Sequence, residues 1–285
     1  MSSIIDFHMH SSASDGKDTL AGLFERVKLL GIKVFSLTDH DTIEGAREME
    51  RLVKASDNDI AFVRGIEFSC ITPIGKCHIL GYGYNWDSAV FISVLSKGAS
   101  LRKGKLEQRI SFLKEKYGIV LPENDVEEMR QMGSVGKPHI AEIMVRIGVA
   151  DTISEAISEY IDNCPTMDSR IPANEVIHAV RESGGISVWA HPYGGVGEER
   201  IDTETFNRQL NYLKEMGLQG LECYYSRYTM GEAERLAECA KQNDLLVSGG
   251  SDYHGRKNYP EIGTLNKENN PVNGKMVNIC GRLIR

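Results

Sequence analysis

The sequence predicts an α/β barrel of about seven strands that is interrupted by a long helical insertion. Three observations support this fold class. Short apolar runs alternate with helical patterns in the first third of the chain, and the same alternation returns after residue 177. Between residues 86 and 177 the apolar spacing is almost entirely helical. Strands that alternate with helices pair in parallel through right-handed crossovers, and a set of this size can close into a barrel.

In the first α/β segment, turn and capping residues mark where the expected helices begin and end. Asp18 or Thr19 can cap its first helix, and Gly31 ends that helix. Thr42 can cap a second helix, which reaches Ala55. Strands are expected at residues 4–7, 33–37, 60–67 and 78–84.

The remaining elements fall into two groups. Gly and Pro residues separate helices expected at residues 88–117, 123–132, 137–147 and 153–163. The later α/β segment is expected to have helices at residues 173–183, 203–216 and 229–243 and strands at residues 186–190, 218–224 and 245–248. We therefore predict a barrel formed by residues 1–85 and 178–285 and an insertion formed by residues 86–177.

The charge balance excludes some function classes. The 285 residues include 33 Lys and Arg and 40 Asp and Glu, which gives a formal net charge of -7. Such a chain lacks the overall basic character of proteins that bind duplex DNA. No run approaches the ~18 apolar residues of a membrane span, and no secretory signal is visible. We expect a cytoplasmic protein without membrane contact.

The six cysteines are scattered and form no Cys-x-x-Cys pair. In a chain of this length, that pattern is typical of reduced thiols in a cytosolic protein. A structural zinc bound by cysteines is therefore not expected. Any metal site must be built from histidine and carboxylate side chains.

Histidine and carboxylate side chains gather where the predicted strands end, which is where parallel α/β barrels place their active sites. Residues two apart on a strand face the same side, so His8 with His10, and Asp252 with His254, can bind one metal ion together. Imidazole suits zinc, iron and manganese, whereas carboxylates suit harder ions and can bridge two metals. The candidate metal-binding residues are His8, His10, Asp15, His40, Glu67, His78, His191, Asp252 and His254.

Other polar residues have simpler interpretations. Six of the eight histidines lie at strand ends or starts, whereas His139 and His178 lie on predicted helices. We expect His178 to be an ordinary helix residue. Asp39 could orient a metal-binding histidine through its second ring nitrogen. Asp41 and Thr42 are expected to cap a helix.

Several segments carry a family resemblance, namely DFHMHSSASDG, LTDHDT, GIEFS, HILGYG, WAHP and GGSDYHG. In order and spacing they resemble the PHP (polymerase and histidinol phosphatase) metallo-phosphoesterases. The insertion segment SVGKPHIAEIMVRIG is similar to the branch of 3′,5′-nucleoside bisphosphate phosphatases and 5′-to-3′ exoribonucleases that act on short RNA. The resemblance implies a distorted (β/α)7 barrel with a helical insertion that forms part of the substrate site.

The resemblance also implies two to three divalent metal ions, drawn from manganese, iron, zinc and magnesium. The implied ligands are His8, His10, Glu67 and Asp252 for the first ion, Glu67, His78 and His191 for the second, and Asp15, His40 and His254 for the third. The implied catalytic residues are Asp15, His40, Glu67, His191 and Asp252. Some family members have histidine where Asp15 stands, and a carboxylate there favours manganese or magnesium.

The implied reaction is hydrolysis of a nucleotide phosphate ester, in a 3′,5′-nucleoside bisphosphate or a short 5′-phosphorylated RNA. Metals about 3.5–4 Å apart would give a metal-bound hydroxide that attacks phosphorus in line with the leaving oxygen. Lys137 and His139 are expected to bind a substrate phosphate, and Tyr224 to stack a base. The alternatives are a phosphatase of another small metabolite, such as histidinol phosphate, and a non-hydrolytic or amidohydrolase-type metal protein.

Overall fold

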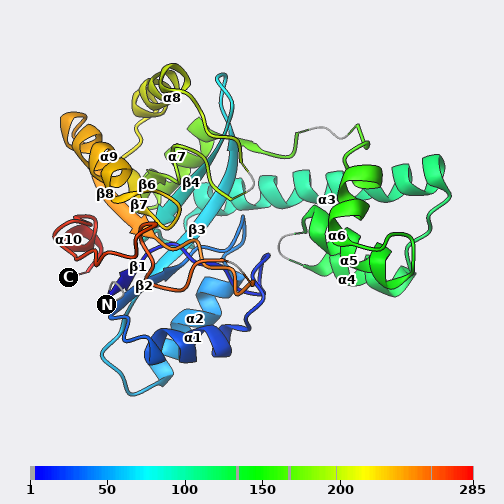
Figure 1. The fold of residues 1–285 in the computed structure, drawn as a ribbon, viewed down its shortest axis with the longest axis horizontal. Helices are drawn as coiled ribbons and strands as arrows, with labels where there is room; N and C mark the ends of the chain where they lie inside the picture. Colours follow the sequence, from blue (N-terminus) through cyan, green and yellow to red (C-terminus); the bar gives the residue numbers. More distant parts are fainter. Residues whose placement is uncertain (1–3, 133–134, 166–167, 197, 258, 285) are drawn as a thin grey trace. The chain divides into compact units, whose positions relative to one another are not determined.

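The structure is a computed structural model that describes residues 4–132, 135–165, 168–196, 198–257 and 259–284. The chain divides into two compact units, whose elements are labelled in Figure 1. The first unit contains Met1–Leu95 and Ile171–Arg285, and the second contains Ser96–Arg170. The second unit lies within the predicted insertion of residues 86–177.

The sheet of the first unit closes on itself. Its strands follow the order β1-β2-β3-β4-β6-β7-β8, and β5 pairs with β3. The bounds are β1 Ile5–Asp6, β2 Val34–Leu37, β3 Ala61–Ile71, β4 Lys76–Tyr82, β5 Ile171–Pro172, β6 Ile186–Trp189, β7 Gly220–Tyr225 and β8 Leu246–Gly250. At the two ends of this order, Phe7 N–H donates to the carbonyl of Gly249 at 3.1 Å and His10 N–H to that of Tyr253 at 2.8 Å. The predicted α/β barrel is confirmed.

One strand departs from the parallel pattern. The pairs β1–β2, β2–β3, β6–β7 and β7–β8 are parallel, but β4 runs antiparallel to both β3 and β6. Only residues 72–75 separate β3 from β4, and Thr72 N–H donates to the carbonyl of Gly75 at 2.9 Å. So short a connection cannot hold a crossover, so the chain reverses. The reversal returns His78 to a position beside Glu67.

Helices of the first unit begin and end largely where capping residues predict. Their bounds are α1 Leu20–Leu29, α2 Glu44–Ala55, α7 Ala173–Glu182, α8 Thr203–Glu215, α9 Met230–Gln242 and α10 Cys280–Leu283. Thr19 caps α1 by accepting a hydrogen bond from Gly22 N–H at 3.2 Å, as predicted. At α2 the N-cap position is Ile43, while Thr42 accepts from Glu44 N–H at 3.3 Å. The α10 turn was not predicted.

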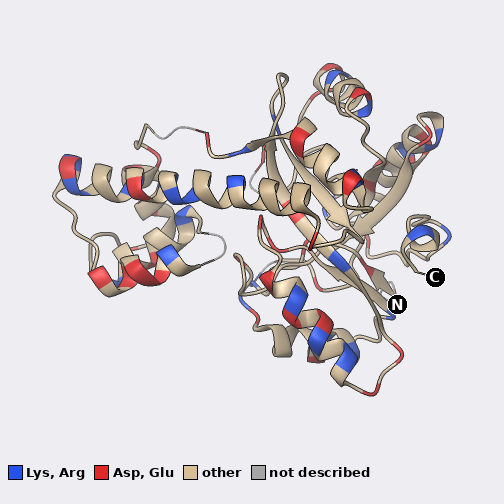
Figure 2. Cartoon of the chain, turned by 180° about the vertical axis from the view of Figure 1, so that it is seen from behind, with Lys and Arg blue, Asp and Glu red and all other residues tan. Residues whose placement is uncertain are grey.

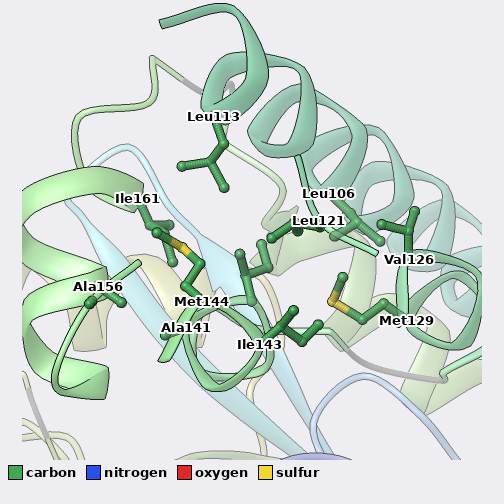
Figure 3. Packing of buried hydrophobic residues seen from close by; sticks show 12 residues of the cluster. Leu106, Leu113, Leu121, Val126, Met129, Ala141, Ile143, Met144, Ala156 and Ile161 are labelled. Atoms are coloured by element: carbon green, nitrogen blue, oxygen red, sulfur yellow. The ribbon is translucent and has the colours of Figure 1, made fainter. Parts of the chain in front are cut away.

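The second unit has its own hydrophobic core, shown in Figure 3. Its elements are α3 Ala89–Tyr117, α4 Glu123–Gln131, α5 Lys137–Arg146, α6 Ile153–Glu155 and the π-helix η1 Ala156–Ile161. Leu113, Ile140 and Met144 are fully buried in this core. The apolar spacing of α3, α4 and α5 thus closes a small helical cluster around its own centre.

The start of α3 belongs to the first unit. Phe91 is fully buried, stacks on Tyr84 with ring centroids 4.2 Å apart, and meets Phe68 edge-on at 6.0 Å. These contacts explain why the first unit extends to Leu95 rather than ending at residue 85. Lys and Arg positions recur along α3, as the colours of the ribbon in Figure 2 show. None of the helices in the described ranges combines the length and apolar character needed to cross a membrane.

Candidate metal centre

The barrel brings all nine predicted metal-binding residues together. His8 and His10 follow β1, His40 follows β2, Glu67 and His78 lie within β3 and β4, His191 follows β6, and Asp252 and His254 follow β8. Asp15 lies on the loop after His10. These residues form overlapping groups whose potential ligand atoms lie within 4.8 Å of one another.

Two of these residues have an unusual backbone conformation. His191 has φ 29° and Asp252 has φ 57°, both in the left-handed region that residues other than glycine rarely adopt. The backbone N–H of His191 is held by the Glu222 carboxylate at 2.8 Å, and that of Asp252 by the carbonyl of His8 at 2.8 Å. Strain of this kind is concentrated at functional sites, where the surrounding structure maintains it.

Five imidazole rings converge on the carboxylate of Glu67, which is 1% exposed. The nitrogens around its Oε2 are His8 Nε2 at 3.3 Å, His10 Nε2 at 3.2 Å and His40 Nδ1 at 3.2 Å. Those around its Oε1 are His78 Nδ1 at 2.9 Å and His191 Nε2 at 3.1 Å. A carboxylate with separate ligand sets on its two oxygens has the arrangement of a bridge between two cations.

A further group surrounds Asp15. Its Oδ1 lies 3.3 Å from Nε2 of His254 and 3.8 Å from Nδ1 of His10. His40 completes this group. The Arg256 guanidinium donates to the backbone carbonyl of Asp15 at 2.6 Å, which fixes the loop. Three side chains from the ends of β1, β2 and β8 therefore meet one loop carboxylate.

The donor set fits divalent cations. His10 Nδ1, Asp15 Oδ1 and His40 Nδ1 are buried without a hydrogen-bond partner among the described residues. Nε2 of His8 lies 3.2 Å from Nε2 of His10, and Nδ1 of His78 lies 3.3 Å from Nε2 of His191. Two unprotonated ring nitrogens repel each other at this distance unless a proton or cation lies between them. Imidazole and carboxylate ligands suit transition-metal ions.

The carboxylates of the centre attract positive charge. Burial opposes ionisation of Asp15, but His40, His254 and His10 hold the pKa of its carboxyl well below the ordinary value. Burial also opposes protonation of His10, but Asp252 and Glu67 outweigh burial and raise its pKa to about 10. Burial dominates at His40 and lowers its pKa to about 3. A metal ion would compete with protons for this charged cluster.

Two carboxylates of the centre are absent from the predicted set. Glu222, on β7, is fully buried and lies with its Oε1 2.8 Å from Nδ1 of His8. Glu198 lies with its Oε2 3.1 Å from Nδ1 of His191, which lowers the pKa of Glu198 to about 2 against the opposing effect of burial. The sequence does contain a signal for Glu222, because it is an acidic residue within the apolar run of β7. Such a position is expected to be buried, and a buried carboxylate needs a partner.

Asp39 and Asp41 accept hydrogen bonds that tie neighbouring segments of the chain together. Asp39 accepts hydrogen bonds from Ser11 N–H at 2.8 Å and from the Ser14 hydroxyl at 2.6 Å, so the expectation that it orients a histidine is wrong. Asp41 accepts from the backbone and hydroxyl of Ser69 at 2.9 and 3.0 Å. It therefore ties the segment after β2 to β3, and the N-cap position of α2 is Ile43.

The structure places Tyr225, not Tyr224, at the centre. The Tyr225 hydroxyl donates to Oδ2 of Asp252 at 2.8 Å, whereas the Tyr224 side chain is 4% exposed and has no open face for a base. The register of β7 against β8 shifts between Glu222 and Tyr224. This irregularity breaks the alternation of side chains, so Tyr225 faces the same side as Glu222.

The other predicted substrate residues lie in the second unit. Lys137 forms an ion pair with Asp162, and His139 Nδ1 accepts a hydrogen bond of 3.0 Å from Gly136 N–H at the start of α5. Their role in substrate binding stays a prediction. His178 is exposed on α7, as expected for an ordinary helix residue.

The chain is similar to curated bacterial enzymes over nearly its full length. It is 30% identical to a 5′-3′ exoribonuclease of Haemophilus influenzae, which covers 90% of this chain and 92% of that one. It is 28% identical to a phosphoribosyl 1,2-cyclic phosphate 1,2-diphosphodiesterase of Eggerthella lenta, covering 89% and 95%. It is 26% identical to a 3′,5′-nucleoside bisphosphate phosphatase of Chromobacterium violaceum, covering 88% and 87%.

The fold and the family model agree with these relatives. The structure matches that of a metal-dependent phosphoesterase from Bifidobacterium adolescentis with a TM-score of 0.76 and 25% identity, over 97% of this chain and 95% of that one. The family model of the PHP domain matches residues 6–164. The chain therefore belongs to the PHP domain family and is a metal-dependent phosphoesterase of that family.

Proposed function

We propose that the enzyme hydrolyses a phosphate ester of a nucleotide, either a 3′,5′-nucleoside bisphosphate or a short RNA with a 5′-phosphate. The observation that carries the proposal is the convergence of five imidazoles on Glu67 beside the group around Asp15. Centres with closely spaced divalent ions are suited to displacement at phosphorus. The named activities of the Haemophilus and Chromobacterium relatives support a nucleotide substrate.

The nine side chains would hold two or three divalent ions. The proposed sets are His8, His10, Glu67 and Asp252, then Glu67, His78 and His191, and finally Asp15, His40 and His254. Glu67 would be shared between the first two sets through its two oxygens. Manganese, iron, zinc and magnesium all fit such a mixture of imidazole and carboxylate ligands.

When bound, the metal ions supply Lewis acidity that activates water and offsets negative charge on the phosphoryl oxygens. The proposed catalytic residues are Asp15, His40, Glu67, His191 and Asp252. The chain's own contribution is to hold these ligand atoms in place, through Glu222 for His8 and through Tyr225 for Asp252. The hydroxyls of Ser11 and Ser14 both donate to Asp39, so neither is positioned as a nucleophile.

Residues outside the centre are assigned to substrate binding. Lys137 and His139 stand in the first turn of α5, where a cation and helical amides favour a phosphate group. Such a substrate would be a small phosphorylated molecule and not duplex DNA. The six cysteines are free thiols, which supports a location in the cytoplasm.

A second candidate is a small phosphorylated metabolite other than a nucleotide. The Eggerthella relative, whose named substrate is a phosphoribosyl cyclic phosphate, supports this class. Histidinol phosphate is another member of the class. Both would use the same metal centre, so the distinction depends on groups that bind the remainder of the substrate.

The test compares substrates on one preparation supplied with manganese. Product release is measured from adenosine 3′,5′-bisphosphate, short 5′-phosphorylated RNA, phosphoribosyl 1,2-cyclic phosphate and histidinol phosphate. We expect one of the first two to have a kcat/KM at least ~100-fold above the others. Glu67→Gln should abolish turnover, whereas Glu234→Gln, at an exposed position of α9, should not. Preferred turnover of either metabolite would reject the nucleotide assignment.

A further inference from the structure

Two cysteines face each other across the hairpin that β3 and β4 form in the first unit (Figure 1). Cys70 of β3 is the register partner of Cys77 of β4, and neither belongs to a disulfide. Cys70 is fully buried, and Cys77 is 5% exposed. Directly opposed residues of an antiparallel pair project to the same side of the sheet, so the two thiols occupy neighbouring positions on one face. We refer to these two residues as the cysteine pair.

The hydrogen-bond ladder sets the separation of the cysteine pair. Hydrogen-bonded and non-hydrogen-bonded pairs alternate along two antiparallel strands. Thr72 N–H donates to the carbonyl of Gly75 at 2.9 Å, and Thr72 and Gly75 lie two positions beyond the cysteine pair in the same register. The cysteine pair is therefore also hydrogen-bonded, which places its Cα atoms about 5.5 Å apart. Disulfides span Cα separations of about 4.4–6.8 Å, so the backbone can accept one here.

A disulfide at this position requires a local movement of the strands. Opposed Cβ atoms in a sheet are about 4.5–5.5 Å apart, and hydrogen-bonded pairs lie toward the wider end of that range. The Cβ atoms of a disulfide are about 3.8 Å apart on average. Closing the bond therefore draws the two positions together by about 1 Å. A bond formed against such resistance is more easily reduced, which suits a reversible modification.

The movement would occur beside the metal centre. The next register pair is Ser69 with His78, and Nδ1 of His78 lies 2.9 Å from Oε1 of Glu67. The N–H and hydroxyl of Ser69 both donate to the carboxylate of Asp41, which directly follows His40 in the chain. Metal sites tolerate changes of only about 0.2 Å in their ligand distances, so a shift of about 1 Å one residue away is large on that scale.

We propose that the cysteine pair is a site of reversible oxidation, where hydrogen peroxide or an organic hydroperoxide forms a disulfide that weakens metal binding at His78 and Glu67. Because Cys77 is the more exposed thiol, it reacts first. Its sulfur takes a hydroxyl from the peroxide and becomes a sulfenic acid, and the second oxygen leaves as water with the thiol proton. The sulfur of Cys70 then displaces the sulfenic hydroxyl, which leaves as a second water with the Cys70 proton. The two sulfurs lose two electrons in total, and the peroxide gains them.

Cys223 and Cys239 are the competing thiols. Burial, together with Cys239, raises the pKa of the Cys223 thiol well above its ordinary value, so these two groups lie near each other. Cys223 belongs to β7 and Cys239 to α9, so no strand register holds them directly opposite. The Cys239 sulfur also accepts a hydrogen bond from the Asn243 amide at 3.6 Å. The experiment must therefore identify which thiols become joined.

The first measurement is a peptide map of the metal-depleted, full-length protein after limited treatment with hydrogen peroxide and alkylation of the remaining thiols. Trypsin cleaves after Arg64, Lys76 and Lys97, so the cysteine pair is divided between peptides 65–76 and 77–97. We expect these two peptides to be joined, with a mass two hydrogens below their sum. Dithiothreitol should separate them. Removal of metal beforehand prevents oxidation of the ligands by bound iron.

The second measurement is manganese affinity, from the electron paramagnetic resonance signal of the unbound ion. Manganese is chosen because it binds thiols poorly. Oxidised wild-type protein should bind manganese about tenfold or more weakly, as when other supports of metal ligands are disturbed, and dithiothreitol should restore the affinity. Cys70→Ala and Cys77→Ala should each abolish the response to peroxide. Cys239→Ser removes a partly exposed thiol and the competing pair, and it should respond as the wild type does.

Three results would overturn the proposal. The first is that peptides 65–76 and 77–97 stay separate while the partly exposed Cys164, Cys239 and Cys280 are oxidised. The second is a disulfide that forms without a change in manganese affinity. The third is a loss of affinity that persists in both alanine variants. Either variant suffices if the other fails to fold, and the peptide map needs neither. None of these results depends on the substrate, so the proposed function can fail while the oxidation site stands.

Discussion

Glu222 connects two histidines of the metal centre that follow different strands. Its Oε1 lies 2.8 Å from Nδ1 of His8, and its Oε2 accepts a hydrogen bond of 2.8 Å from the backbone N–H of His191. Because an ionised carboxylate only accepts hydrogen bonds, Nδ1 of His8 carries the proton. Nε2 of His8 faces Glu67 and His10, so a metal ion that displaces the Nε2 proton would bind at that nitrogen.

Glu222→Gln should therefore weaken metal binding. The amide oxygen can accept from one of the two neighbours, but the amide nitrogen cannot accept from the other. We expect metal affinity to fall about 10- to 100-fold, as for other residues that orient metal-binding histidines. Competition with a chelator measures this, and Glu234→Gln on the exposed face of α9 is the matched control. Equal affinities in the two variants would contradict the positioning role.

Asp15→Ala tests the group formed with His10, His40 and His254. The variant should bind about one metal equivalent fewer and lose most turnover, since Asp15 supplies the only carboxylate of that group. Its melting temperature without metal should change little because Asp15 lies on a loop. His178→Ala, at an exposed position of α7, is the control and should change neither property. Full metal content in Asp15→Ala would remove Asp15 from the ligand set.

The meeting of His10 with Asp252 could be predicted from the sequence. Strand alternation places His8 and His10 on one side, and a closed barrel brings the ends of its first and last strands together. The structure accordingly has Nε2 of His10 3.2 Å from Oδ1 of Asp252. The antiparallel course of β4 was not predicted, although the expected strands at residues 60–67 and 78–84 leave too few residues between them for a crossover helix.

Other features of the site could not be predicted from the sequence, because they depend on contacts between residues far apart in the chain. Glu222 and His8 are 214 positions apart, and their pairing appears only once the barrel closes. The register shift on β7 moves Tyr225, in place of Tyr224, to the side of Asp252. Alternation along the strand alone assigns these tyrosines to the wrong faces. The pairing of Lys137 with Asp162 likewise depends on how the helices of the second unit pack.

The ion pair between Glu50 and Arg64 should give a small, pH-dependent stabilisation. Burial opposes ionisation of Glu50, but hydrogen bonds from Arg64 at 3.0 Å and from Lys54 outweigh it and lower the pKa of Glu50. A lowered carboxyl pKa stabilises the fold above the ordinary value of 4.5, and the stabilisation is lost as pH falls through the lowered pKa.

Glu50→Gln should accordingly reduce the free energy of unfolding at neutral pH by less than about 1 kcal/mol, because the pair is partly exposed. The difference from the wild type should shrink in acid. Urea unfolding of the metal-depleted protein at several pH values measures it. Glu48→Gln on the same helix is the control, since Glu48 pairs with the exposed Arg51 at 3.0 Å and should matter less. A difference that grows in acid would reverse the assigned sign.

Lys137 and Asp162 should have opposite effects on phosphate binding. Their ion pair is about half exposed, and Asp162 also acts on Arg109, so the carboxylate competes with any phosphate for both cations. Lys137→Ala should raise KM for a 3′,5′-bisphosphate several-fold with little change in kcat, because binding is lost equally from substrate and transition state. Asp162→Asn should lower KM, since it frees positive charge without adding a contact. Steady-state kinetics on the bisphosphate and on p-nitrophenyl phosphate measure both effects, and the second substrate should respond to neither variant. If both variants raise KM, the pair serves the packing of the second unit, and Lys137 does not bind the substrate phosphate.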